Sequence, residues 1–316
     1  MEFRVLGPLD VRSSSGKQIR FPRPGQRALL SLLLLRAGNT VTRSSLIDDL
    51  WGGRPPLNPG AALRNTVYEV RRVFGAPDHI ETCGNGYLFR LGQDDYLDLH
   101  AFRELRAEGE KTLARGDLSL AAARLEEALN LWREPALADS PPHAVRYGTA
   151  TALLEERALA QQMLIDVMLD LGRHRDAVVI LYQLTASNPL RERWWELLML
   201  ALYRSGDQAA SLQAFTQARG TLAEKCGIDP GPGLQSLQQR ILAADPTLRQ
   251  SDRTRLSVAA IPSPGFRIKE GVQGYSGGRP AGQWLEDSAK TYIRLVTRVS
   301  QIHSVNLVRC KDLLVS

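Results

Sequence analysis

The amino-acid sequence predicts a mainly α-helical protein whose N-terminal part also contains small β-sheets. Three observations support this fold class. Short β-prone runs with turn residues are confined to the first 92 residues. Apolar residues at helical spacing fill the stretch from residue 100 to residue 245. Within that stretch two glycine-centred turns, at Gly172 and Gly206, lie 34 residues apart, which is the tetratricopeptide period.

Composition and charge set the broad class. The chain has 316 residues, 43% of them hydrophobic and 23% charged, which is typical of globular domains and sufficient for two or three of them. The net charge of +6 is unevenly distributed: residues 1–90 hold 13 Lys/Arg against 7 Asp/Glu, whereas residues 91–250 hold 17 against 22. A basic N-terminal part is the electrostatic pattern expected of a protein that binds a phosphate backbone.

The first elements are short strands followed by two helices. Residues 3–11 are predicted to form a strand pair bent at Gly7-Pro8, and residues 18–21 a further strand. Pro24 begins a helix that runs to about residue 36 and buries its leucines. Thr42 is the predicted N-cap of the next helix, over residues 43–51.

The third predicted helix, over residues 59–74, carries the strongest functional pattern. Pro59 suits its start and Gly75 its end. One face is an apolar stripe, and the other faces carry guanidinium, amide and phenol groups, which are the groups that contact phosphates and base edges in a DNA major groove. The polar residues are Arg64, Asn65, Tyr68, Arg71 and Arg72. The alternative is a solvated surface helix with unengaged arginines.

A β-hairpin is predicted to follow this helix. Asn85-Gly86 separates two β-prone runs, residues 80–82 and 87–91, and favours a type I′ turn with φ > 0 at both central residues. Strands, three helices and a hairpin make a winged helix-turn-helix domain over residues 1–92. The third helix would enter the major groove, with Arg71 and Arg72 mostly neutralising phosphates. Asn85 and Tyr87 would place the wing along the flanking backbone or the minor groove.

The rest of the chain divides into a helical domain and a tail. Residues 94–99 are predicted to be an acidic connector, and residues 97–248 a tetratricopeptide-like array of irregular helical hairpins. Its helices are predicted over residues 101–115, 118–132, 144–171, 175–187, 190–205, 208–226 and 233–244. Residues 249–316 comprise a Ser/Gly/Pro-rich linker and a basic tail, in which residues 284–302 could form an amphipathic helix of unassigned function.

These residues resemble a known family. Phe-Arg-Val-Leu-Gly-Pro-Leu (3–9), Pro-Gly-Gln-Arg-Ala-Leu-Leu (24–30), Leu-Ile-Asp-Asp-Leu-Trp-Gly (46–52), Val-Arg-Arg-Val-Phe-Gly (70–75) and Gly-Tyr-Leu-Phe (86–89) are similar to the Streptomyces antibiotic regulatory proteins, activators with an OmpR-type winged helix. Leu-Trp-Arg-Glu-Pro-Ala-Leu-Ala-Asp (131–139), Asn-Pro-Leu-Arg-Glu-Arg (188–193), Leu-Met-Leu-Ala-Leu-Tyr-Arg-Ser-Gly (198–206) and Gly-Ile-Asp-Pro-Gly-Pro (227–232) resemble the bacterial transcriptional activator domain of that family. The resemblance covers residues 1–248.

The resemblance implies function. It implies sequence-specific binding to direct repeats in the promoters of secondary-metabolite genes, a homodimer on double-stranded DNA, and recruitment of RNA polymerase through its sigma and alpha subunits. By analogy with winged-helix activators, the polymerase-contact candidates are Asp48, Asp49, Trp51 and Arg54. A different class of function, a helical scaffold that binds proteins without contacting DNA, remains the alternative.

Two departures from the family pattern affect base preference. Glu69 stands on the third helix where a basic or neutral polar residue is more usual, and Cys83-Gly84-Asn85 replaces the expected basic or proline-containing wing tip. Glu69 can accept a hydrogen bond from a cytosine N4 amine. The alternative is an ion pair with Arg72, three residues further along the helix.

Other chemistry is not indicated by the sequence. The three cysteines lie far apart, so neither a metal nor a disulfide site is expected, and no cofactor is predicted. Gly274-Tyr275-Ser276-Gly277-Gly278 matches a nucleophile elbow, but it lies in a Gly/Pro-rich linker with only His303 beyond it, so we expect coincidence and no enzyme activity. With neither a signal peptide nor a membrane-length apolar run, we expect a cytoplasmic, nucleoid-associated protein that makes no membrane contact.

Overall fold

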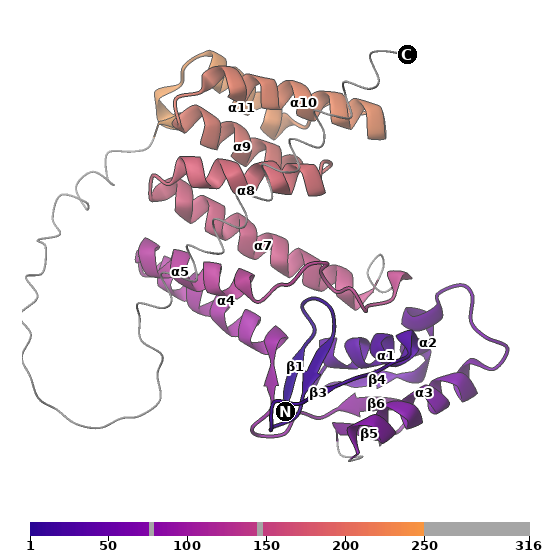
Figure 1. Cartoon of the computed structure of the whole chain (residues 1–316). Coiled ribbons are helices and arrows are strands. Elements are labelled where there is room, and N and C mark those ends of the chain that lie inside the picture. Colours follow the sequence, from indigo (N-terminus) through magenta and orange to yellow (C-terminus); the bar gives the residue numbers. More distant parts are fainter. Residues whose placement is uncertain (76–78, 144–147, 250–316) are drawn as a thin grey trace, which may run out of the picture. The chain divides into compact units, whose positions relative to one another are not determined.

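The computed structural model of the chain describes residues 1–249, with gaps at 76–78 and 144–147 (Figure 1). The predicted linker, the amphipathic helix over residues 284–302 and the segment from Gly274 to Gly278 lie outside the described residues. No helix in the described part is long and apolar enough to cross a membrane. Helices predominate and the sheets are confined to the N-terminal part, which confirms the predicted fold class.

A four-stranded sheet begins the fold. β1 (Glu2–Arg4) pairs antiparallel with β2 (Asp10–Arg12), and β2 pairs with β3 (Gln18–Ile19). The fourth strand, β7 (Tyr96–Leu97), pairs parallel with β1 and places Leu97 opposite Phe3. The prediction that residues 94–99 are only a connector was therefore wrong. Two residues are too few to produce an alternating pattern, and the partner of this strand lies at the other end of the domain.

Three helices and a second sheet complete the winged helix-turn-helix. The helices are α1 (Pro24–Leu35), α2 (Arg43–Trp51) and α3 (Pro59–Phe74). The sheet has the order β4-β6-β5, formed by β4 (Thr40–Thr42), β5 (Ile80–Cys83) and β6 (Gly86–Phe89). α1 is buried from Leu29 to Leu35 because it packs on α2, α3 and β6. Sequence analysis predicted the three helices and the hairpin but missed β4.

The helical region is a series of antiparallel hairpins. It comprises α4 (Asp98–Ala114), α5 (Leu118–Asn130), α7 (Thr149–Asp170), α8 (His174–Ser187), α9 (Glu192–Arg204), α10 (Gln208–Cys226), α11 (Pro232–Leu242) and a final 3₁₀ turn, Pro246–Leu248. Gly172 and Gly206 end helices at φ of 75° and 91°, values that glycine adopts without steric cost. Leu181 and Phe215, one period apart, are both buried. The predicted tetratricopeptide-like architecture is thus confirmed.

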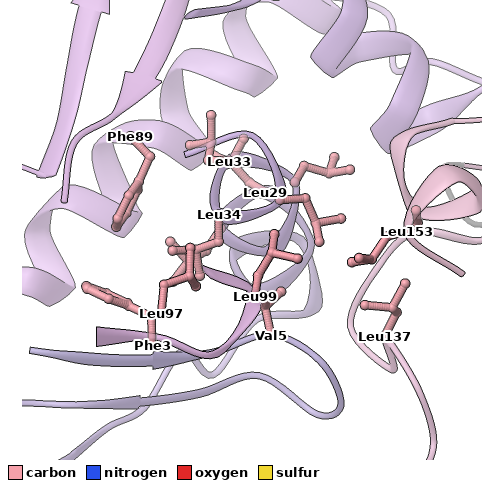
Figure 2. Packing of buried hydrophobic residues seen from close by; sticks show 14 of the residues in the cluster. Phe3, Val5, Leu29, Leu33, Leu34, Phe89, Leu97, Leu99, Leu137 and Leu153 are labelled. Atoms are coloured by element: carbon pink, nitrogen blue, oxygen red, sulfur yellow. The ribbon is translucent and has the colours of Figure 1, made fainter. Parts of the chain in front are cut away.

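One hydrophobic core joins the winged helix to the start of the helical region. Figure 2 shows Phe3, Val5 and Leu29 in the same cluster as Leu137 and Leu153, which come after α5 and from α7. A second cluster fills the later helices, from Ala122 in α5 to Leu248. The proposed division at residues 92–97 therefore runs between two parts of the chain that share one core.

Candidate nucleic-acid interface

Helix α3 holds its polar face in solvent through local features of its sequence. The Asn58 side chain caps the helix by accepting a hydrogen bond from the Ala61 N–H at 3.0 Å, and Gly75 ends it at φ 72°. Leu63, Val67 and Val70 are buried in the core and fix the orientation of the helix about its axis. A helix anchored along one stripe must present its opposite face outward.

Four of the five predicted contact residues on α3 share that outward face. Arg64, Asn65, Tyr68 and Arg72 are all exposed, and the Tyr68 side chain is 65% exposed. Steps of one, three and four residues keep these positions within about a quarter of the helix circumference. The face therefore presents two guanidinium groups, an amide and a phenol together.

Arg71 has different partners from the other four. Its Nε and Nη2 donate hydrogen bonds to the carbonyl oxygen of Ile80 at 3.0 and 2.7 Å, and Nη2 also donates to the Thr82 hydroxyl at 3.0 Å. Both partners belong to β5, so Arg71 ties α3 to the wing. Because Ile80 lies nine residues beyond Arg71, across a chain reversal, helical periodicity gave no indication of this contact.

Glu69 is also engaged within the winged helix. Its carboxylate is ion-paired with Arg23, at the start of α1, and accepts a hydrogen bond from Gln26 Nε2 at 3.1 Å. The Arg23 hydrogen bond, then that of Gln26, lowers the pKa of Glu69, and Arg72 adds a weaker attraction. The bonded arginine is thus Arg23 rather than Arg72, the partner that helical spacing favoured. Arg23 lies 46 residues away in sequence, which explains why it was missed.

The wing is a tight hairpin held against the start of α2. Cys83 pairs with Gly86, so the two turn residues are Gly84, at φ 53°, and Asn85. The hairpin was therefore predicted correctly. The predicted type I′ turn was wrong, because it requires positive φ at both central residues and Asn85 does not have positive φ. Positive φ at the first central residue alone is the property of a type II′ turn.

Asn85 and Tyr87 have different environments on this hairpin. Asn85 is exposed, and its carbonyl oxygen accepts a hydrogen bond from the Arg43 N–H at 2.9 Å. Tyr87 is only 3% exposed and lies under the Arg43 guanidinium, 5.8 Å from the ring centroid. A Cβ on Gly86 would lie 2.3 Å from the Val41 carbonyl oxygen, so only glycine fits there. Asn85 is thus presented to solvent, and Tyr87 fixes the hairpin from inside.

The polymerase-contact candidates divide in the same way. Asp48, in α2, and Arg54, in the loop that joins α2 to α3, are exposed, as is Leu57 near the end of that loop. Asp49 is 6% exposed and paired with Arg36 at 3.1 Å; burial raises its pKa and the arginine opposes that shift.

Trp51, at the end of α2, packs partly buried against the first core. Its carbonyl oxygen accepts a hydrogen bond from the Arg54 N–H at 3.2 Å. Asp49 and Trp51 therefore anchor the segment that leads from α2 into the exposed loop.

Side chains from the helical region hold the winged helix in place. The buried Asp98 carboxylate accepts hydrogen bonds from the N–H groups of Val5 at 2.8 Å and Leu6 at 3.1 Å. Asp139 accepts one from the Leu9 N–H at 2.8 Å and one from Arg27 Nε at 2.7 Å. These contacts span 92 to 130 residues of sequence and were not predicted.

In the part of the chain that the structure describes, no group of three or more His, Cys, Asp or Glu side chains is placed to hold a metal ion.

Comparisons with known proteins agree with this architecture. Residues 17–89 match the family model "Transcriptional regulatory protein, C terminal", and residues 97–242 match "Bacterial transcriptional activator domain". The chain is 45% identical over 257 residues to the regulatory protein AfsR of Streptomyces coelicolor, covering 79% of this chain and 25% of AfsR. It therefore spans about a quarter of the length of that relative.

Shorter relatives and a solved structure match more completely. The regulatory protein DnrI of Streptomyces peucetius is 38% identical over 83% of this chain and 98% of its own length. A structure of Mycobacterium tuberculosis EmbR in complex with a low-affinity phosphopeptide superposes with a TM-score of 0.65 at 30% identity, covering 81% of this chain and 67% of that one. The chain belongs to the Streptomyces antibiotic regulatory protein family of transcriptional regulators.

Proposed function

We propose that this chain is a sequence-specific DNA-binding transcription activator, a pathway-specific regulator of secondary-metabolite genes. The observation that carries the proposal is the outward face of α3, where Arg64, Asn65, Tyr68 and Arg72 are exposed together while the opposite stripe is buried. In a winged helix-turn-helix this face enters the major groove. Among the described residues, no hydrogen bond or ion pair engages these four side chains. DNA would supply the partners that they lack within the protein.

The residues take distinct roles in this proposal. Arg64, Asn65 and Tyr68 contact base edges or the adjacent sugar-phosphate, and Arg72 neutralises a phosphate. Arg71 acts mainly by holding the wing through Ile80, so its contribution to phosphate binding is secondary. Asn85 meets the flanking backbone, and the buried Tyr87 positions it.

Activation is assigned to the last part of α2 and to the loop between α2 and α3. Asp48 and Arg54, with the neighbouring Leu57, form the accessible surface for the sigma and alpha subunits of RNA polymerase, whereas Asp49 and Trp51 support it from within. Two chains would occupy direct repeats as a homodimer, in the cytoplasm and at the nucleoid. The proposed activity is binding and recruitment, with no enzymatic step and no cofactor.

The test uses the full chain because its first core extends into α7. Selection from random duplexes would yield the preferred site, and fluorescence anisotropy would measure the affinity for it across a salt titration. We expect a consensus containing a repeated half-site, two chains per duplex, and an affinity that falls steeply with salt. Absence of any salt-dependent binding would sink the proposal.

A protein-binding scaffold is the competing function, and one observation favours it. Val179 and Tyr182, one turn apart on α8, are 55% and 48% exposed. A pair of exposed apolar side chains on a helical array is a possible contact for a protein. In that case substitutions on α3 would leave function intact while Tyr182→Ala would abolish it, the opposite of what DNA binding requires.

A further inference from the structure

The ion pair between Arg23 and Glu69 lies beside the outward face of α3. Glu69 directly follows the exposed Tyr68 and precedes Arg72 by three residues on the same helix. The Arg23 side chain is 67% exposed, whereas that of Glu69 is 28% exposed. The carboxylate is therefore the inner member of the pair, and the guanidinium is the outer one.

Arg23 has donors left over after this contact. A guanidinium has five N–H groups, and Nη1 is the Arg23 side-chain atom that bonds Glu69. Its Nε and Nη2 edge is a fork that matches two oxygens of a phosphate. An arginine that is held on one edge and open on the other has lost much of its rotamer freedom before it binds, which lowers the entropic cost of binding.

A second arginine lies within the field of the same carboxylate. Arg72 is exposed. The Arg23 hydrogen bond is the largest cause that lowers the pKa of Glu69, and the charge of Arg72 adds a smaller contribution in the same direction. An unpaired carboxylate at this position would repel the DNA backbone. Between two arginines it is neutralised, and the three side chains together carry a net positive charge.

We propose that Arg23 and Arg72 form a clamp for one phosphate of the DNA backbone, and that Glu69 is a positioning residue that holds Arg23 in this clamp. The inference rests on the proposed function and deepens it, since it adds a phosphate contact from the start of α1 and removes Glu69 from the residues that read bases. Gln26 restrains the second carboxylate oxygen of Glu69 and so fixes the geometry.

The salt dependence of binding tests Arg23 directly. In the full chain, Arg23→Ala should reduce the slope of log affinity against log salt by about one unit, which makes the affinity loss between about 50 and about 200 mM salt roughly 3.5-fold smaller. Arg23→Lys should keep the slope. Arg115→Ala removes an equally exposed arginine from the end of α4 and should leave the slope unchanged.

The double variant Arg23→Ala with Glu69→Gln distinguishes a phosphate contact by Arg23 from mere neutralisation of the Glu69 charge. If Arg23 only neutralised the carboxylate, Arg23→Ala would have no effect once Glu69→Gln had removed the negative charge. The clamp predicts instead that Arg23→Ala with Glu69→Gln has a slope about one unit below that of Glu69→Gln alone. Equal slopes for these two proteins would overturn the clamp, as would an unchanged slope in Arg23→Ala.

The role of Glu69 has its own readout. A positioning residue affects affinity without choosing a base, so selection from random duplexes should return the same consensus for Glu69→Gln as for the wild type. A change confined to one base position would show that Glu69 reads a base and would overturn the positioning role.

Thermal unfolding of each variant checks that it is folded, and Arg23→Gln replaces Arg23→Ala if Arg23→Ala is not folded. Absence of salt-dependent binding by the wild type would overturn both the clamp and the proposed function, whereas wild-type binding with an unchanged Arg23→Ala slope overturns the clamp alone.

Discussion

The guanidinium of Arg71 holds the carbonyl oxygen of Ile80 with two hydrogen bonds, so the helix proposed to enter the groove is fastened to the first strand of the wing. Arg72, the next residue, is exposed and makes no such contact within the described residues. Two adjacent arginines on one helix therefore have different tasks. The difference follows from helix geometry, because successive residues point about 100° apart.

Substituting these two arginines should separate stability from DNA affinity. Arg71→Ala leaves the buried Ile80 carbonyl without its donor and should cost about 1–3 kcal/mol of unfolding free energy. Arg72→Ala should leave stability within about 0.5 kcal/mol and flatten the salt dependence of DNA binding by about one unit. Urea denaturation and anisotropy measure the two effects. Equal destabilisation by both substitutions would contradict this assignment.

The close approach of Gly86 to Val41 makes a second prediction. Gly86→Ala would place a Cβ 2.3 Å from the Val41 carbonyl oxygen, so β4 and β6 must separate and the wing must shift. We expect a loss of about 1–3 kcal/mol of unfolding free energy, of the size seen for overpacked sites. Gly220→Ala in α10 is the matched control: it meets nothing within 4 Å and should stabilise the protein by about 0.5–1 kcal/mol. A neutral Gly86→Ala in thermal unfolding would refute this account.

Asp98 should be essential for the attachment of the winged helix. Asp98→Ala leaves the buried N–H groups of Val5 and Leu6 without an acceptor, at about 1–3 kcal/mol each. Asp94→Ala, an exposed acid four residues earlier, should change stability by no more than about 0.5 kcal/mol. Chemical denaturation of both variants provides the comparison. Similar denaturation midpoints for Asp98→Ala and Asp94→Ala would contradict the prediction, because they would mean that water replaces the Asp98 carboxylate at no cost in free energy.

Asp98 also predicts a pH dependence. Burial raises the pKa of Asp98, and the hydrogen bonds from Val5 and Leu6 oppose the shift only in part. The folded protein therefore keeps this proton to a higher pH than the unfolded chain does. The contribution of Asp98 to stability is then fully present below the unfolded pKa and declines as pH rises through the folded pKa. Asp98→Asn cannot titrate, so its unfolding free energy should fall less with pH over that interval, as urea titrations at several pH values would show.

Substitutions in the last part of α2 and in the loop between α2 and α3 should reduce transcription without affecting DNA binding. Leu57→Ala, Asp48→Ala and Arg54→Ala alter exposed side chains, so each should leave duplex affinity unchanged. If Leu57 is a central contact, its removal should cost about 1 kcal/mol of polymerase binding, or about a fivefold loss of transcript. Run-off transcription from the selected site with purified RNA polymerase measures this. Leu120→Ala, which alters an exposed leucine on α5, is the control and should be silent.

The sequence alone determined the succession of helices and the hairpin, although not the short strands β4 and β7. Leucine spacing, caps and glycine stops are local signals, because a helix depends on neighbours three and four residues away. They placed α1, α2, α3 and the later helices. They also assigned Arg64, Asn65, Tyr68, Arg71 and Arg72 to the polar faces of α3, and all of these except Arg71 are exposed. The Asn85-Gly86 pair likewise indicated the hairpin, although not its turn type.

Only the tertiary structure decided what distant residues do to one another. The structure shows that β7 pairs with β1, that Arg23 rather than Arg72 holds Glu69, and that Asp98 and Asp139 hold the first strands and α1. All of these relationships join residues 46 to 130 positions apart in the sequence. No periodic pattern encodes such pairs, since they arise when the elements pack around a common core. The same reason makes Arg71 a fastening for the wing and buries Asp49 and Tyr87, while their neighbours Asp48 and Asn85 remain exposed.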